Sequence, residues 1–380
     1  MSFSVCVGTA NALSYPQGGH LWVFINWSLG FRAAGARRVI WLDLVDPGES
    51  PETLQDRIAV LKSRIAPYGL ANALALVTPD GRAVEGDTGC LGPDEATSAE
   101  LLFDLRYDLP ESVVRRFRRS ALLDLDPGLL QIAMQHGRMN PAPHDVYFTI
   151  GEARGRLGWS FPTLGLDWVH LPPCISTDDW PVQPAPSDGA YTTVSHWYMN
   201  EWMLDEDGSS YRNDKRSAFL PFVGLPRRVA APLELAIHLA GDARERRMLE
   251  GHGWRVKEAH DVAASPADLQ RYVQHSRGEF SCAKPAYVRM GTSWISDRTL
   301  CYLASGRPAI IQDTGPSRYL DGRDGVLRFS TLDEAVECLG AVGSNYAAHA
   351  GAARSLAEEH FAAPKVAARV LDQLLGKPRG

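Results

Sequence analysis

The first 44 residues carry the pattern that most restricts how this chain can fold. Residues 3–9 form a short apolar run with β-branched side chains, which predicts a buried strand. After a loop at 10–20, apolar side chains recur at three- and four-residue spacing from Leu21 to Leu29, which predicts a helix. Residues 38–44 predict a second strand. Because a strand–helix–strand crossover is right-handed and leaves its two strands parallel, this start predicts an open α/β sheet.

The second half of the chain repeats this alternation after a change in composition. Residues 171–190 contain five prolines with aspartate, serine and glycine, which is typical of a connection between domains, so the boundary is predicted near residue 180. Helices are predicted between further strands at 191–194, 233–239, 254–257 and 308–313. The predicted fold class is α/β, with two facing Rossmann-like domains and a cleft between them.

Length and composition exclude several classes of protein. A chain of 380 residues predicts two domains or one large one, and 45% hydrophobic with 22% charged residues excludes a disordered chain. The formal charge of −6 argues against general affinity for nucleic acid or anionic membranes. No stretch approaches the roughly 18 apolar residues of a membrane helix, and residues 1–8 lack the features of a signal peptide. The six cysteines show no C-x-x-C or zinc spacing, so we expect a soluble cytoplasmic protein without a metal site; its oligomeric state stays open.

The densest group of candidate ligand-binding residues lies in 278–315. The stretch 291–298 is rich in glycine, serine and threonine and leads into a helix that Gly306 and Pro308 end. The N–H groups at a helix N-terminus favour a bound phosphate or diphosphate. Hydroxyl and cationic side chains could add to such a site: Lys284, Thr292, Ser293, Ser296 and Arg298. The alternative is a capped helix with ordinary surface cations.

Polar side chains also end the strand predicted at 308–313. Gln312 and Asp313 stand at its carboxyl end, followed by Thr314 and Gly315. Open α/β sheets bind ligands at the carboxyl ends of their strands, so both side chains are candidates for ligand contact. The alternative is a polar turn after a buried strand.

A histidine lies at the corresponding end of the first strand. The tripeptide Gly18-Gly19-His20 forms the end of the loop before the first helix. A histidine whose pKa is near neutral can act as general base toward a hydroxyl, although a packed or helix-capping histidine is the alternative. The glycines do not form G-x-G-x-x-G, and no G-x-S-x-G, H-E-x-x-H or Walker lysine motif is present.

With these residues the chain resembles the GT-B glycosyltransferases. The resemblance rests on Gly18-Gly19-His20 before a tryptophan-containing helix, on 191–197, and most sharply on 278–315. In that family a small-residue turn and a helix N-terminus hold the diphosphate of a nucleotide sugar, and the next strand end meets the sugar. The chain departs from it in two ways. Residues 291–294 read Gly-Thr-Ser-Trp in place of a His-Cys-Gly-Trp-type motif, and the Glu-x7-Glu pair of retaining members is not found. The nucleotide base is therefore left open, and an inverting reaction is favoured.

The resemblance implies a division of roles along the chain. An N-terminal domain over 1–180 would bind the acceptor, and a C-terminal domain over 181–352 would bind the nucleotide sugar. A terminal helix over 353–380 would return toward the N-terminal domain, and His20 would be the catalytic base. The residues implied at the diphosphate are Ser195, Lys284, Ser293, Ser296 and Arg298. Those implied at the nucleoside or sugar are Asp297, Gln312 and Asp313.

The predicted function is transfer of a sugar from a nucleoside-diphosphate sugar to a hydroxyl of a small-molecule acceptor, by analogy a natural product. The reaction would invert the anomeric centre and need no metal or cofactor besides the donor, a co-substrate. Two alternatives remain: a sugar-nucleotide epimerase-hydrolase on the same layout, and a non-catalytic nucleotide-sugar binding protein. Trp22, Trp197 and Trp294 fall beside predicted cleft loops and could shape a sugar or acceptor pocket; the other seven tryptophans are expected in ordinary packing.

Overall fold

The computed structural model divides the chain into two compact units. The residues that the structure describes are 3–153, 158–204 and 210–376. The first unit comprises 1–151, 161–176 and 361–380. The second unit comprises 152–160 and 177–360. Among the described residues, no helix is long and apolar enough to cross a membrane.

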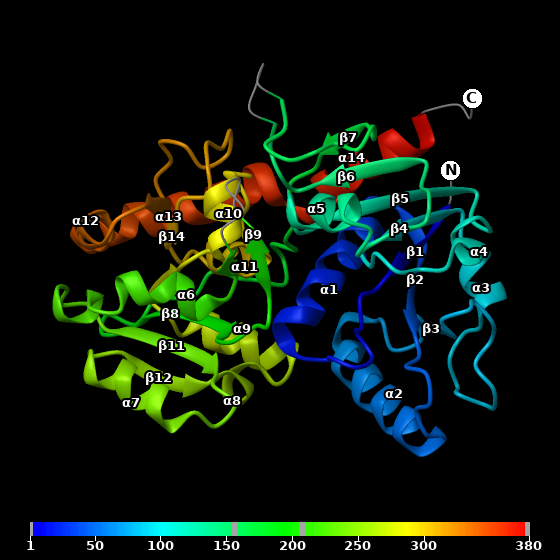
Figure 1. The fold of residues 1–380 in the computed structure, drawn as a ribbon, viewed down its shortest axis with the longest axis horizontal. Coiled ribbons are helices and arrows are strands. Elements are labelled where there is room, and N and C mark those ends of the chain that lie inside the picture. The colour runs from blue at the N-terminus through cyan, green and yellow to red at the C-terminus, as the bar shows by residue number, and fades with distance from the viewer. Residues whose placement is uncertain (1–2, 154–157, 205–209, 377–380) are drawn as a thin grey trace. The chain divides into compact units, whose positions relative to one another are not determined.

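The first unit is built on one sheet of seven parallel strands (Figure 1). Its strands are β1 Phe3–Gly8, β2 Ala36–Leu44, β3 Leu74–Val77, β4 Leu101–Asp104, β5 Arg119–Asp124, β6 Val146–Thr149 and β7 Trp168–His170. Its helices are α1 Gly18–Ala33, α2 Pro51–Ile65, α3 Pro93–Thr97, α4 Glu111–Val114, α5 Leu129–Gln135 and α14 Ala363–Gly376, with a 3-10 turn at Ala66–Tyr68. The spatial order β3-β2-β1-β4-β5-β6-β7 reverses direction between β1 and β4. The predicted parallel α/β sheet is therefore confirmed, and its topological switch point lies between these two strands.

Helices α1 and α14 lie against each other in the first unit. A Cβ at Gly30 of α1 would lie only 2.7 Å from the Ala363 carbonyl oxygen, so glycine allows this close approach. The predicted single helix over 353–380 is interrupted within the described residues, and 377–380 lie outside them. Helix α13, Tyr346–Leu356, ends before a π-helical turn at Ala357–Phe361, and α14 begins only after it.

The second unit is built on a parallel sheet of six strands in the order β12-β11-β8-β13-β14-β15. These strands are β8 Tyr191–His196, β11 Leu233–His238, β12 Arg255–Glu258, β13 Gly278–Ser281, β14 Ala309–Gln312 and β15 Val326–Phe329. An antiparallel pair joins β9 Trp202–Leu204 and β10 Ser210–Arg212. Besides α13, its helices are α6 Lys215–Phe219, α7 Ala243–Gly251, α8 Ala259–Ala263, α9 Pro266–Gln274, α10 Pro285–Met290, α11 Asp297–Ala304 and α12 Leu332–Ser344, with 3-10 turns at Leu220–Phe222 and Leu225–Arg227. The order reverses between β8 and β13, so this unit has its own switch point there.

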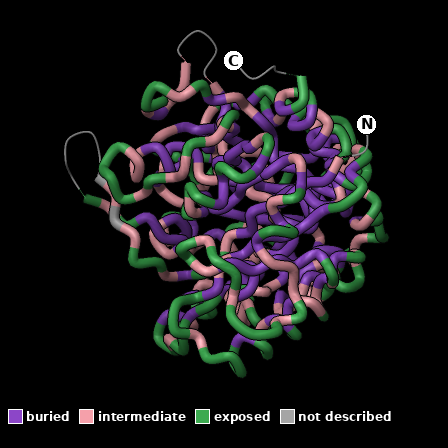
Figure 2. Tube along the Cα trace, turned by 90° about the vertical axis from the view of Figure 1, so that its right-hand side faces the viewer, coloured by how far each residue is buried: buried purple, intermediate pink, exposed green. Residues whose placement is uncertain are grey.

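Aromatic side chains fill much of the apolar interior. In the second unit the Phe280 and Phe329 rings stack with centroids 5.1 Å apart, and Trp197 is completely buried beside Phe219. In the first unit Trp22 is 1% exposed. Figure 2 shows such buried segments in purple and the exposed ones in green. The prediction that Trp22 and Trp197 line a ligand pocket is therefore wrong: both belong to packed cores.

Candidate functional site

The switch point of the second unit is held together by Arg298. Strands β8 and β13 pair only over two residues, ending at Glu279 and Thr192. Beyond them the Arg298 side chain bridges the strands: Nε lies 2.9 Å from Glu279 Oε1, Nη1 donates to the Val194 carbonyl at 2.8 Å, and Nη2 donates to Ser281 Oγ at 2.6 Å. All three guanidinium nitrogens are thus occupied within the sheet. These bonds give Arg298 a structural role between the two strands, and its role at a diphosphate stays a prediction.

The predicted phosphate-binding turn is also more closed than expected. Ser293 has a left-handed φ of +62°, and its hydroxyl donates to the Pro316 carbonyl, so this side chain fixes the turn and its proton is not available to a phosphate. Ser296 caps α11 by accepting from the Arg298 backbone N–H at 3.3 Å. The hollow beside Trp294 and Ser296 measures about 10 Å³, room for a single water. Asp297 is half-buried and is not among the residues that line this hollow.

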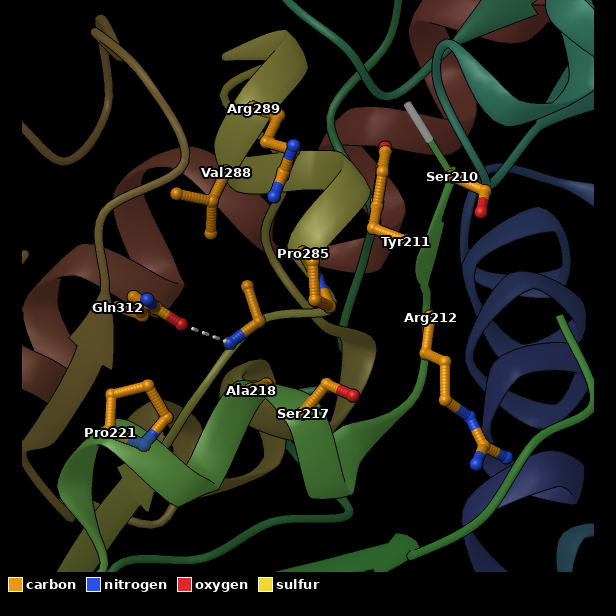
Figure 3. Close-up of a pocket in the computed structure, with 11 residues that line it drawn as sticks. Ser210, Tyr211, Arg212, Ser217, Ala218, Pro221, Pro285, Val288, Arg289 and Gln312 are labelled. Atoms are coloured by element: carbon orange, nitrogen blue, oxygen red, sulfur yellow. Dashed lines mark hydrogen bonds between the residues drawn. The ribbon is translucent and has the colours of Figure 1, made fainter. Parts of the chain in front are cut away.

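An open pocket of about 470 Å³ adjoins that hollow (Figure 3). Gln312 and Ala283 line both spaces, and the Gln312 Oε1 accepts the Ala283 N–H at 3.1 Å. On the far wall, the Arg289 guanidinium lies 4.0 Å from the centre of the Tyr211 ring. The volume falls in the range of small-molecule sites. Asp313 lies outside the pocket and pairs with Arg328 at 2.9 Å, so Gln312 alone of this predicted pair reaches it.

Lys215 is the main candidate that the sequence did not reveal. It begins α6 after the cap Asp214, and its Nζ donates to the Cys282 carbonyl, next to Ala283 in both pocket walls. Burial lowers the pKa of Lys215 to about 7, and the positive charges of Arg298 and Lys284 act in the same direction. A lysine after a capping aspartate is typical of a surface helix start, so only tertiary structure distinguishes this one.

Two further predicted diphosphate contacts lie at the same edge of the sheet. The Lys284 Nζ lies 3.1 Å from Glu201 Oε2, with its side chain 18% exposed. Ser195 is the last residue but one of β8 and is half-buried. Together with Lys215, they place cationic and hydroxyl groups around the carboxyl ends of β8 and β13, where open α/β sheets bind ligands.

In the first unit, His20 lies in the first turn of α1. Gly18 and Gly19 are the first two helical residues, so the predicted glycine loop ends earlier than expected. His20 Nε2 lies 2.5 Å from the Ala10 carbonyl oxygen, and its ring packs edge-on against Phe24. Because a carbonyl can only accept, Nε2 carries the proton and Nδ1 carries the lone pair. Burial lowers the pKa of His20, which keeps the imidazole neutral and able to take up a proton.

Neither unit offers an obvious metal site within the described residues. No group of three or more His, Cys, Asp or Glu side chains among them is placed to hold a metal ion. The six cysteines, all in the described part of the chain, are free thiols.

Two parallel α/β units, each with a switch point, define a protein of GT-B architecture. Solved structures share it over nearly the whole chain. HepE of Anabaena, solved with UDP and glucose, matches with a TM-score of 0.59 and 11% identity over 100% of both chains. Sucrose-phosphate synthase of Thermosynechococcus elongatus matches at 0.54 and 11%, covering 98% of each chain. AviGT4, a glycosyltransferase of avilamycin A biosynthesis, matches at 0.54 and 12%, covering 98% of this chain and 96% of its own. No protein-family model matches the chain, and no curated protein matches its sequence.

Proposed function

We propose that this protein is a glycosyltransferase that moves a sugar from a nucleoside-diphosphate sugar to a hydroxyl of a small-molecule acceptor. The observation that carries the proposal is the buried Lys215, whose Nζ donates to the carbonyl of Cys282, the residue before Ala283 in the wall of the open pocket. A buried amine with a lowered pKa gains stability when an anion neutralises it, and a diphosphate supplies that charge. The binding of UDP by HepE, which has the same fold, supports UDP as the first nucleotide to test.

Within this proposal the second unit binds the donor. Lys215 and Lys284 contact the diphosphate, with Ser195 and Ser296 as hydroxyl donors. Gln312 contacts the sugar or nucleoside from the wall that both spaces share. Arg298, Ser293 and Asp313 support this arrangement through their bonds within the unit.

The first unit binds the acceptor and supplies the base. His20 Nδ1 takes the proton of the acceptor hydroxyl while its oxygen attacks the anomeric carbon of the donor. The bond from that carbon to the diphosphate oxygen breaks, and the nucleoside diphosphate leaves with the electron pair. Attack opposite the leaving group inverts the anomeric centre, and the two lysines stabilise the charge that develops on the diphosphate. We propose that this step needs no metal; undiminished turnover in EDTA tests that point.

A ligand panel and a turnover assay test the proposal in sequence. UDP, dTDP and GDP are added separately while thermal unfolding is followed, because a ligand that binds only the native state raises the apparent unfolding temperature. The matching nucleotide sugar is then incubated with a panel of hydroxylated small molecules, and release of nucleoside diphosphate is measured. Lys215→Met should show a smaller thermal shift at the same nucleotide concentration. The exposed Lys257→Met serves as the matched control and should keep the wild-type shift.

Three results would contradict the proposal. If no nucleotide raises the unfolding temperature, the second unit does not bind a nucleotide donor. Free sugar or an epimer from donor alone, at the rate seen with acceptors, indicates an epimerase-hydrolase. Nucleotide binding without turnover across the acceptor panel indicates a binding protein. An analysis of the product anomer by NMR separately tests inversion.

A further inference from the structure

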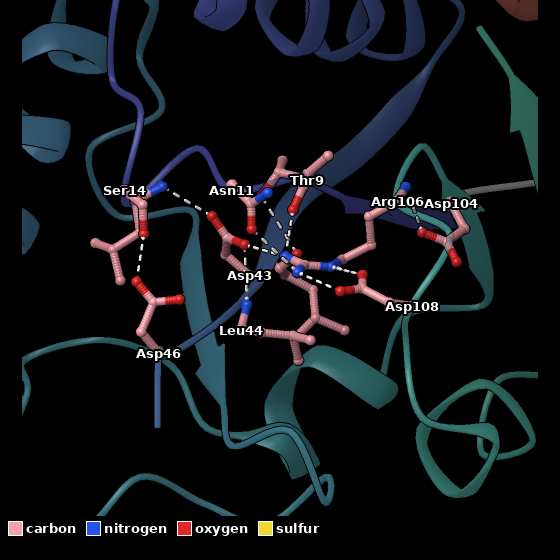
Figure 4. A network of polar contacts seen from close by, with 12 residues as sticks. Thr9, Asn11, Ser14, Asp43, Leu44, Asp46, Asp104, Arg106 and Asp108 are labelled. Atoms are coloured by element: carbon pink, nitrogen blue, oxygen red, sulfur yellow. Dashed lines mark hydrogen bonds and ion pairs between the residues drawn. The ribbon is translucent and has the colours of Figure 1, made fainter. Parts of the chain in front are cut away.

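The first unit contains a buried ion-pair network at its own switch point (Figure 4). Arg106, just beyond β4, is 3% exposed, and Asp43, near the end of β2, is completely buried. Arg106 Nη1 pairs with Asp43 Oδ1, its Nε lies 2.6 Å from Asp108 Oδ1, and its backbone N–H donates to Asp104 Oδ1 at 3.0 Å. The guanidinium therefore has its charge balanced and its orientation fixed from several directions.

The same guanidinium also forms hydrogen bonds to the loop between β1 and α1. Its Nη1 donates to the Thr9 carbonyl at 2.9 Å, and its Nη2 donates to Asn11 Oδ1 at 3.3 Å. Asp43 adds another hydrogen bond to this loop by accepting the Leu13 N–H at 2.8 Å. These contacts lie on both sides of Ala10, one residue before it and one after it. The loop is thus fixed where Ala10 presents its carbonyl group.

The Ala10 carbonyl is the group that His20 Nε2 contacts at 2.5 Å. We infer that Arg106 is a positioning residue for His20: by holding Thr9 and Asn11 it keeps the Ala10 carbonyl where it binds the Nε2 proton and leaves the lone pair on Nδ1. The catalytic meaning of this arrangement rests on the proposed function. The choice of tautomer does not, because it is a property of the folded first unit alone.

A substitution of Asn11 can weaken the bonds between Arg106 and the loop without removing the buried ion pair of Arg106 and Asp43. Its side chain is exposed and its backbone has φ +55°, a conformation that glycine and aspartate both tolerate. Asn11→Gly removes the loop acceptor for Arg106 Nη2, which keeps its bond to Asp108 Oδ2 at 3.2 Å, whereas Asn11→Asp retains an acceptor oxygen in the loop. Arg57 supplies the control, since it binds Ser14 farther along the loop and the exposed Asp46 but does not flank Ala10.

The experiment measures the His20 tautomer directly. Histidine-selective ¹⁵N labelling of the full chain and long-range ¹H–¹⁵N correlation distinguish Nε2–H from Nδ1–H, and the His20 signals are identified by their loss in His20→Ala. We expect Nε2–H in the wild type, in Arg57→Met and in Asn11→Asp, and a mixture of tautomers in Arg106→Met and Asn11→Gly. Where turnover is present, kcat should fall about 10- to 100-fold in Arg106→Met, with the KM for the donor unchanged.

The outcomes separate this inference from the proposed function. An unchanged Nε2–H tautomer in both Arg106→Met and Asn11→Gly overturns the positioning role. If Arg106→Met does not fold, the comparison of Asn11→Gly with Asn11→Asp decides. A shifted tautomer in a protein whose wild type transfers no sugar supports the positioning role and removes the proposed function instead.

Discussion

The two units have switch points of the same topology but opposite charge balance. In the first unit the Arg106 guanidinium pairs with the carboxylates of Asp43 and Asp108, and the Arg106 backbone N–H donates to Asp104. In the second unit the cations Arg298 and Lys284 each have a carboxylate partner, while Lys215 forms no ion pair among the described residues. The arginine at the switch point of the first unit thus has carboxylate partners, whereas the second unit has one buried lysine without such a partner among the described residues.

This difference separates structural cations from candidate ligand-binding ones. A buried arginine with several partners is expensive to disturb and holds backbone in place, as Arg106 and Arg298 do. A buried lysine bonded only to a carbonyl keeps its charge at a cost, which appears as the lowered pKa of Lys215. The second unit is therefore the one suited to an anionic ligand, and the first unit supplies a neutral histidine in the first turn of α1, bonded to the fixed loop at Ala10.

The largest expected effect is on turnover and comes from the first unit. His20→Ala should lower kcat about 100- to 10,000-fold, because the acceptor hydroxyl loses its base. The affinity for nucleoside diphosphate should not change, since the candidate donor residues all lie in the second unit. Steady-state kinetics and titration calorimetry measure the two quantities.

His136→Ala is the matched control for that variant. His136 is an exposed histidine of the same unit, following α5, and its removal should leave kcat unchanged. Full turnover in His20→Ala would remove the base from the proposed mechanism.

The next effect is on stability and tests the structural role of Arg298. Arg298→Met leaves Glu279 buried without its partner and removes the bonds to Val194 and Ser281. The free energy of unfolding should fall by about 3–5 kcal/mol, measured by urea denaturation. Nucleotide affinity of the folded fraction should change little. A large loss of affinity with unchanged stability would restore Arg298 as a diphosphate ligand.

Local sequence pattern was enough for the elements but not for the partners of their polar residues. The opening strand, helix and second strand are confirmed because their apolar periods reflect burial that each segment carries in its own sequence. The sequence did not predict the strand β4, although the equally short β12 and β14 were predicted. The partners of Ser293 and Arg298 could not be predicted in this way, because Pro316 and Val194 lie far from them in the sequence.

The third effect concerns the charge excess of the second unit. Lys215→Met should weaken UDP binding about 10- to 100-fold, the range expected for losing a charge-assisted contact. The free energy of unfolding should change by less than about 1 kcal/mol, because the lost bond to Cys282 is offset by removing a buried amine. Calorimetry and urea denaturation measure these two responses. Unchanged affinity would show that Lys215 does not face the nucleotide.

The smallest effect is a pH dependence that only the second unit should show. The groups acting on Lys215 are Arg298 and Lys284, which lower its pKa together with burial, and Glu279 and Cys282, which raise it. With a pKa of about 7, the amine loses its proton as pH rises above 7, whereas a bound diphosphate raises that pKa and requires proton uptake on binding. The dissociation constant for UDP should therefore increase between about pH 7.5 and 9, by up to about tenfold per unit, while the phosphate itself stays fully ionised. Lys215→Met should bind with a flat profile over this range. If the dissociation constant of Lys215→Met still increases with pH, another group takes up the proton. The proposed difference in charge between the two switch points would then be wrong.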